Sequence, residues 1–149
     1  MLSHLLCDNP AAKRRALAVT LSGGRAPSKL LPLLMSQLAG AVSPVAARML
    51  RAALVWAHGC PEAVAALLGE PGHVAVLVDL AEGRLGGEDA LVGGLAAALL
   101  GCCLLHAPRE GPGLLQPALL DVVAGRVGLS QFFGPVSYTH LTLPTKRIV

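Results

Sequence analysis

Two pairs of cysteine and histidine residues have the spacing in this sequence that comes nearest to a reactive site. Cys102 and His106 are four residues apart, so a helix would place both on one face. His58 and Cys60 lie close together in an earlier segment. Two thiolates and two imidazoles could in principle bind zinc in a tetrahedral site. The separation of the pairs and their unspecific spacing favour buried or boundary side chains instead, so we assign no metal ligand.

No other group of residues points to catalysis or to a bound cofactor. The sequence contains no G-x-S-x-G nucleophile elbow, no P-loop and no Rossmann glycine pattern. The stretch GRLGG at residues 83–87 lacks a preceding strand and is interpreted as a turn. Glu88 and Asp89 are paired carboxylates at an expected helix start, where they complement the helix dipole rather than act as acid and base. We therefore expect a protein that is not an enzyme, with no catalytic residue and no cofactor.

The composition is that of a folded domain with an aliphatic core. Of the 149 residues, 54% are hydrophobic, 14% are charged and 3% are aromatic, which argues against disorder. Without Lys146 and Arg147 the net charge of +3 falls to +1, that is, 10 basic residues against 9 acidic ones. The basic run at residues 13–15 is expected on a solvated helix face, so no nucleic acid is expected as a partner. The four cysteines are interpreted as reduced core thiols of a cytosolic protein.

Proline and glycine divide the sequence into short segments with a helical spacing of apolar residues. Ser43-Pro44 and Cys60-Pro61 are interpreted as helix starts, since proline in the first turn gives up no hydrogen bond. Residues 74–78 could form a short strand, but the spacing favours helix, and no strand is expected before residue 134. Seven helices are expected, over residues 11–21, 28–38 (or from 32), 43–58, 60–69, 71–83, 88–106 and 114–124, followed by a short eighth over 129–133.

The apolar faces of these segments are wide, which predicts an all-α fold. In the third helix Val45, Met49 and Trp56 share one side with two alanines, while Arg48 and Arg51 face outward. Short helices with apolar residues on more than one side pack in layers, as the helices of an α-solenoid do. We therefore expect stacked helices that offer an extended surface to protein partners.

The sixth helix leaves one alternative open. Residues 90–107 contain no Asp, Glu, Lys or Arg, and this run of 18 approaches the roughly 20 residues that span a bilayer. Aromatic belts are absent, and Arg109 is a single flanking base. A central solenoid helix that is buried on all sides has the same composition. A small membrane-embedded helical protein with a span near residues 90–107 is therefore the alternative.

Three stretches, in this order, resemble a known family. SPVAARMLRAALVWAHGCPEAVAALLGEPGHVAVLVDLAEG is followed by GGEDALVGGLAAALLGCCLLH and, after a linker, by LLDVVAGRVGLSQFF. The order resembles the last repeats of the armadillo-like head domain of the general vesicular transport factor family, the coiled-coil vesicle tethers of traffic from the endoplasmic reticulum to the Golgi. The likeness is carried by the Trp56 helix closing on Cys60-Pro61, the Leu80–Glu82 segment and the apolar run Leu91–Leu95.

The resemblance implies a non-catalytic protein-interaction module, folded as an armadillo-like α-solenoid fragment of seven to eight short helices over residues 1–134. It implies a role in tethering and docking transport vesicles at the Golgi membrane, with Rab-type GTPases, SNAREs and other tethers as partners. It also implies a cytoplasmic protein, peripheral on Golgi membranes, from a family that dimerises through a coiled coil; no heptad repeat follows here. No individual binding residue carries over.

The last residues differ abruptly from the rest. PVSYTHLTLPT, from Pro135, resembles the translation of a sequencing-library adapter, and its composition breaks with the Ala- and Leu-rich chain before it. A strand over residues 137–143 would have no partner. We therefore expect residues 135–149 to be a non-native, disordered tail and exclude them from the fold.

Overall fold

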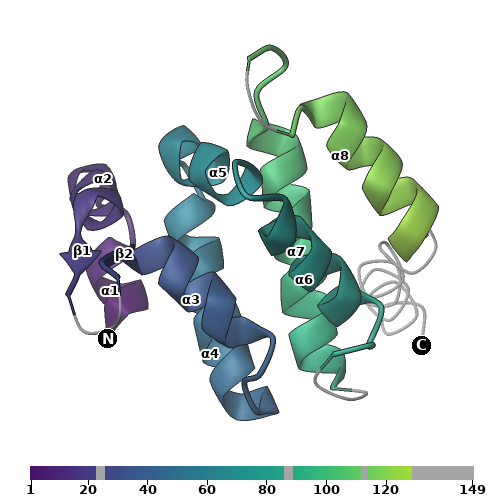
Figure 1. Cartoon of the computed structure of the whole chain (residues 1–149), viewed down its shortest axis with the longest axis horizontal. Coiled ribbons are helices and arrows are strands. Elements are labelled where there is room, and N and C mark those ends of the chain that lie inside the picture. The colour runs from purple at the N-terminus through teal and green to yellow at the C-terminus, as the bar shows by residue number, and fades with distance from the viewer. Residues whose placement is uncertain (23–25, 86–88, 112–113, 129–149) are drawn as a thin grey trace, which may run out of the picture.

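A computed structural model of the chain describes residues 1–22, 26–85, 89–111 and 114–128 (Figure 1). These residues form eight α-helices and one two-stranded hairpin, and a π-helical turn over Val123–Val127 continues the last helix. The helices are α1 (Leu2–Leu6), α2 (Pro10–Ala18), α3 (Leu30–Leu38), α4 (Ser43–Ala57), α5 (Pro61–Leu68), α6 (Pro71–Ala81), α7 (Ala90–His106) and α8 (Gln116–Val122).

Proline and capping side chains set the starts of most of these helices. Proline stands at the first or second position of α2, α4, α5, α6 and α8, where its missing N–H costs no hydrogen bond. Asn9 caps α2 by accepting a hydrogen bond of 3.0 Å from Ala12 N, and Asp89 caps α7 by accepting one of 2.9 Å from Leu91 N. In the first turn of α5, a backbone hydrogen bond lowers the pKa of the Glu62 carboxyl. The helix-start role predicted for Asp89 is thus confirmed, whereas Glu88 lies outside the described residues.

A short hairpin stands where the sequence predicted only helix and loop. Strands β1 (Thr20–Leu21) and β2 (Ser28–Lys29) pair antiparallel, with Thr20 opposite Lys29. Helix α2 therefore ends before the hairpin, and α3 begins directly after it. The prediction of no strand before residue 134 was wrong, because β-branched Val19 and Thr20 favour extended backbone over the last turn of a helix.

The two ends of the described chain also depart from the expected helix limits. The sequence did not predict α1, although its Leu6 is buried in the core. The last helix begins after the expected residue 114, and its π-helical turn carries it past Ala124. Gly128, with a φ of 76°, follows that turn. The short helix expected over residues 129–133 and the boundary expected at residue 134 lie outside the described residues.

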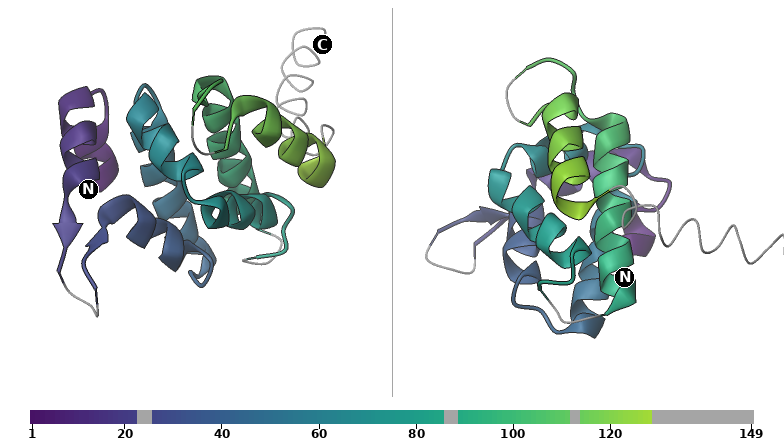
Figure 2. Two further views of the ribbon diagram at one scale, coloured as in Figure 1. Left: turned by 45° about the horizontal axis from the view of Figure 1, so that its top comes forward. Right: turned by 90° about the vertical axis from the view of Figure 1, so that its right-hand side faces the viewer.

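The helices pack with a period of three elements, so that equivalent helices lie side by side. Helix α4 packs along α7 and against α1, while α2 contacts α5 and α3 contacts α6. Figure 2 shows the resulting stack from two further directions. Helical repeats stacked in register in this way are the architecture of armadillo-like solenoids. The predicted all-α, armadillo-like fold is therefore confirmed.

The core between the layers is aliphatic and is built around one tryptophan. Trp56 and Leu50 of α4, and Leu99 of α7, are all 0% exposed. Val45, expected on the apolar side of α4, is 46% exposed instead. The start of α4 thus presents an uncovered surface.

The length of the apolar helices bears on the membrane alternative. In the described parts of the chain, no single helix has both the length and the apolar character needed to cross a bilayer, and α7 has 17 residues. Helices α5 and α6 meet that requirement only when they are taken together, and they are bent by 91° from each other.

Candidate functional site

A groove of about 510 Å³ opens beside the C-terminal ends of α4 and α7 and the turn between α1 and α2. Because α1, α4 and α7 hold equivalent places in the repeat, the groove lies on the face that these helices share. The walls are largely apolar, and Leu105 on its rim is 79% exposed. This α4–α7 groove is lined by Cys7, Asp8, Lys13, Leu54, Val55, His58, Ala98, Gly101, Cys102, Leu105 and His106.

The groove brings together three of the four residues weighed as zinc ligands. His58, Cys102 and His106 all line it. Cys60 does not, because it is buried at the start of α5, where its thiol donates a hydrogen bond of 3.5 Å to Glu62 Oε2. Across the described ranges, no three His, Cys, Asp or Glu side chains are arranged to hold a metal ion. The structure therefore places His58, Cys102 and His106 together in the lining of the groove.

Two thiols of α7, Cys102 and Cys103, are poor nucleophiles. Burial raises the pKa of Cys102, against a smaller lowering by the charge of Lys13. Burial, together with the neighbouring Cys102, raises the pKa of Cys103 to about 12. All four cysteines are free. Because the thiolate is the reactive form, Cys102 and Cys103 stay in the unreactive thiol form near neutral pH.

Lys13 lines the groove and is buried rather than solvated. Its side chain is 5% exposed, and its ammonium donates a hydrogen bond to the carbonyl oxygen of His58. That carbonyl belongs to the residue that caps the C-terminal end of α4, where the helix dipole favours a positive charge. Arg14 and Arg15 are exposed as expected. The prediction for Lys13 was wrong, because a basic run in the sequence does not show which of its members faces the neighbouring helix.

Two residues of the lining, Cys7 and Asp8, were not identified from the sequence. They form the turn between α1 and α2, and Asp8 has a φ of 51°, which is uncommon for a residue other than glycine. The segment Cys7-Asp8-Asn9-Pro10 does carry a turn signal in its Asp-Asn-Pro order. That signal predicts a chain reversal but cannot show that the turn lies beside α4 and α7.

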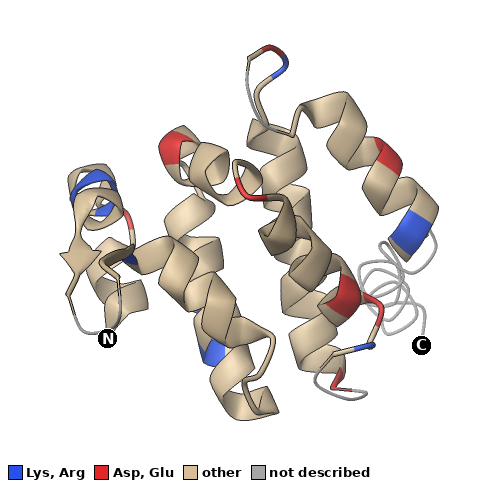
Figure 3. Ribbon diagram, in the orientation of Figure 1, with Lys and Arg blue, Asp and Glu red and all other residues tan. Residues whose placement is uncertain are grey.

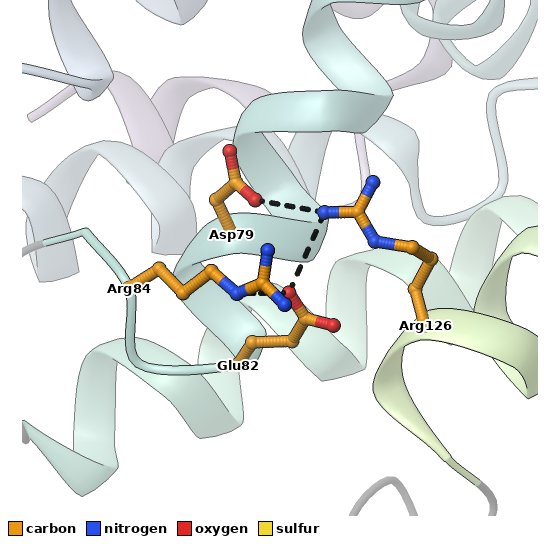
Figure 4. A network of polar contacts seen from close by, with 4 residues as sticks. All are labelled: Asp79, Glu82, Arg84 and Arg126. Atoms are coloured by element: carbon orange, nitrogen blue, oxygen red, sulfur yellow. Dashed lines mark hydrogen bonds and ion pairs between the residues drawn. The ribbon is translucent and has the colours of Figure 1, made fainter.

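A cluster of four charged residues links α6 to the π-helical turn after α8 (Figure 4). Arg126 Nη2 lies 3.2 Å from Asp79 Oδ1 and 3.6 Å from Glu82 Oε2, and Arg84 Nε lies 2.9 Å from the same Glu82 oxygen. The Glu82 side chain is 8% exposed, and its Oε2 takes part in these ion pairs without a hydrogen bond of good geometry. Both carboxylates face arginines, so the cluster serves to hold two elements together.

The stacked helices and the apolar groove define the class of protein. Helical repeats of this kind offer extended surfaces to protein partners. A sequence model of the head region of Uso1 / p115 like vesicle tethering proteins matches residues 1–138. The chain therefore belongs to this family of vesicle tethering proteins, within the head region, as the sequence resemblance predicted.

Individual relatives match over most of the chain. It is 28% identical over 140 residues to General vesicular transport factor p115 of Homo sapiens and of Bos taurus, and each match covers 92% of this chain. It is 25% identical over 150 residues to Golgin candidate 6 of Arabidopsis thaliana, with 89% of this chain covered. The chain spans 15% of the length of the two transport factors and 16% of the plant protein.

Proposed function

We propose that this chain is a non-catalytic docking module of a vesicle-tethering factor and acts in vesicle docking and fusion at the Golgi membrane. The proposed partners are Rab-type GTPases, SNAREs and other tethers. The protein would meet them in the cytoplasm while it is peripheral on the Golgi membrane. Membership of the vesicle-tethering family supports this role.

The observation that carries the proposal is the α4–α7 groove. Its walls come from separate helices of the repeat, so only the correctly stacked protein presents it. Exposed Leu105 and half-buried Leu54 give it apolar contact surface that a partner can cover. Amphipathic segments of protein partners bind apolar grooves of this kind by laying their apolar face into them.

Binding of purified candidates to the immobilised full chain tests the proposal. Rab-type GTPases would be offered with a GTP analogue or with GDP, and SNAREs as soluble domains. We expect at least one of them to bind and Leu105→Glu to weaken that binding by about tenfold or more, because it places a charge in the apolar contact.

The matched control is Leu120→Glu, a substitution of the same type at a residue of α8 that is 49% exposed and outside the groove. This variant should bind as the unsubstituted chain does. If no candidate binds, or if both variants lose binding equally, the groove is not the docking site.

A further inference from the structure

Charge is divided unequally along this chain, which the small net charge conceals. Residues 1–61 contain seven Lys or Arg and one Asp, whereas residues 62–134 contain three Arg and eight Asp or Glu. In the described chain, basic residues accordingly predominate on α2 and α4, and acidic residues from α5 onward (Figure 3). The first half of the stack thus carries an excess of positive charge that its own carboxylates do not balance.

Two of these positive charges stand on the uncovered start of α4. Arg48 and Arg51 are both exposed and are three residues apart, so they lie on one side of the helix about one turn from each other. Among the described residues, the ion pairs involve only Arg14, Arg84 and Arg126 as bases. Arg48 and Arg51 are therefore cations without a carboxylate partner in the described chain.

Two hollows, each with a mixed polar and apolar lining, flank the two arginines. One, of about 550 Å³, lies between the start of α1 and α4 and includes both arginines with Val45 and Met49. The other, of about 370 Å³, lies between the end of α3 and the start of α4 and shares Val45 and Met49 with the first. Val42, at the edge of the second hollow, is 68% exposed. The two hollows therefore adjoin each other at Val45 and Met49.

We propose that this α4 ridge (Val45, Arg48, Met49 and Arg51) docks an acidic amphipathic helix of a protein partner. Two carboxylates one turn apart on that helix would pair with the two arginines, and its apolar residues would enter the hollows. The two hollows beside the ridge favour a helix over a membrane surface, because a flat lipid layer cannot fill them. The ridge shares no lining residue with the α4–α7 groove, so this inference goes beyond the proposed function and does not depend on it.

A synthetic helix tests the inference by fluorescence anisotropy with the full chain. The probe is a labelled peptide with leucines on one face and glutamates three residues apart beside them. The variant Arg48→Glu/Arg51→Glu should bind it about tenfold more weakly or worse, since two attractive pairs become repulsive. The matched control is Arg15→Glu/Arg109→Glu, which changes the net charge equally at two exposed arginines outside the ridge. It should bind the probe as the unsubstituted chain does.

Further peptides and variants distinguish binding at the α4 ridge from general attraction between opposite charges. A peptide with lysine in place of glutamate should not bind, and Val45→Asp should weaken binding while leaving the circular dichroism spectrum unchanged. The milder Arg48→Gln/Arg51→Gln variant should weaken binding as well, which covers the case that the double glutamate variant does not fold. Equal losses in the ridge and control variants, or binding to phosphatidylserine vesicles but not to the peptide, would overturn the proposal.

Discussion

Trp56 of α4 and Lys13 of α2 hold their two helices together in a reciprocal way. The indole Nε1 of Trp56 donates a hydrogen bond of 3.0 Å to the carbonyl oxygen of Lys13, while the Lys13 ammonium donates to the carbonyl oxygen of His58 at the end of α4. Both side chains are withdrawn from water, with exposed fractions of 0% and 5%. A buried hydrogen-bonding group that loses its partner is costly, so this contact fixes α2 beside the α4–α7 groove.

Replacing the tryptophan tests that contact. Trp56→Phe keeps an aromatic ring but removes the donor to the Lys13 carbonyl, and the smaller ring leaves a gap in the core. We expect the free energy of unfolding to fall by about 1–3 kcal/mol. Urea denaturation followed by circular dichroism measures it. A Trp56→Phe protein as stable as the unsubstituted chain would show that the hydrogen bond contributes nothing.

Replacing Lys13 tests the second hydrogen bond, from its ammonium to the carbonyl oxygen of His58. Lys13→Met retains the buried stem but leaves the His58 carbonyl at the C-terminal end of α4 without its donor. We expect a loss of about 1–3 kcal/mol, because hydrogen bonds to charged groups are stronger than neutral ones. Arg15→Met, on the exposed side of the same helix, should change stability by no more than about 0.5 kcal/mol. If Lys13→Met lowered the free energy of unfolding no more than Arg15→Met does, the buried hydrogen bond of Lys13 would be contradicted.

The ion-pair cluster leads to a local prediction. Arg126→Ala removes the side chain that joins the π-helical turn to Asp79 and Glu82 of the α6 end. The Arg126 side chain is 49% exposed, so solvent weakens the effect and we expect a loss of only about 0.5–1 kcal/mol. Hydrogen–deuterium exchange should become faster in residues 116–127 and stay unchanged in α4. Unchanged exchange in α8 would contradict a linking role for the cluster.

Alkylation should distinguish the cysteines by burial. Cys7 is exposed, whereas burial raises the pKa of Cys102 and brings that of Cys103 to about 12. At pH values well below 12 Cys103 is a protonated thiol, and it reacts slowly because only the thiolate is alkylated. Mass spectrometry of the folded chain with iodoacetamide should show Cys7 modified first and Cys103 last, with all four modified in urea. Early modification of Cys103 would mean that α7 is not packed as described.

Gly59 is predicted to be required for its backbone conformation. It follows α4 with a φ of +64°, and a Cβ atom there would meet nothing within 4 Å. Gly59→Ala should therefore cost about 1–2 kcal/mol from the left-handed conformation alone. Gly40→Ala is the control, because it has the same open space without a positive φ, and it should be neutral or slightly stabilising. Thermal melts of both variants make the comparison.

Most of the helices, though not α1, could be predicted from the sequence because their signals are local. Pro44 and Pro61 stand in first turns, and Gly59 and Gly83 follow helix ends with positive φ, as the sequence pattern indicated. The hairpin was missed because its strands are two residues long, too short for an alternating pattern to be visible.

The groove could not be predicted, because it depends on which helices become neighbours. His58 and Cys102 are 44 positions apart in the sequence and meet only because α4 packs along α7. Burial of Lys13 has the same origin, since it depends on the place of α2 beside the end of α4. Contacts between distant segments leave no periodic trace in a single sequence.

Equivalent helices stack at a period of three elements, and both proposed docking surfaces depend on this stacking. Nuclear Overhauser contacts in the isotope-labelled full chain test it most directly. We expect contacts from α4 to both α1 and α7, and from the Trp56 indole proton to α2 around Lys13. If α4 instead showed contacts only with its sequence neighbours α3 and α5, the stacked solenoid and both proposed docking surfaces would be contradicted.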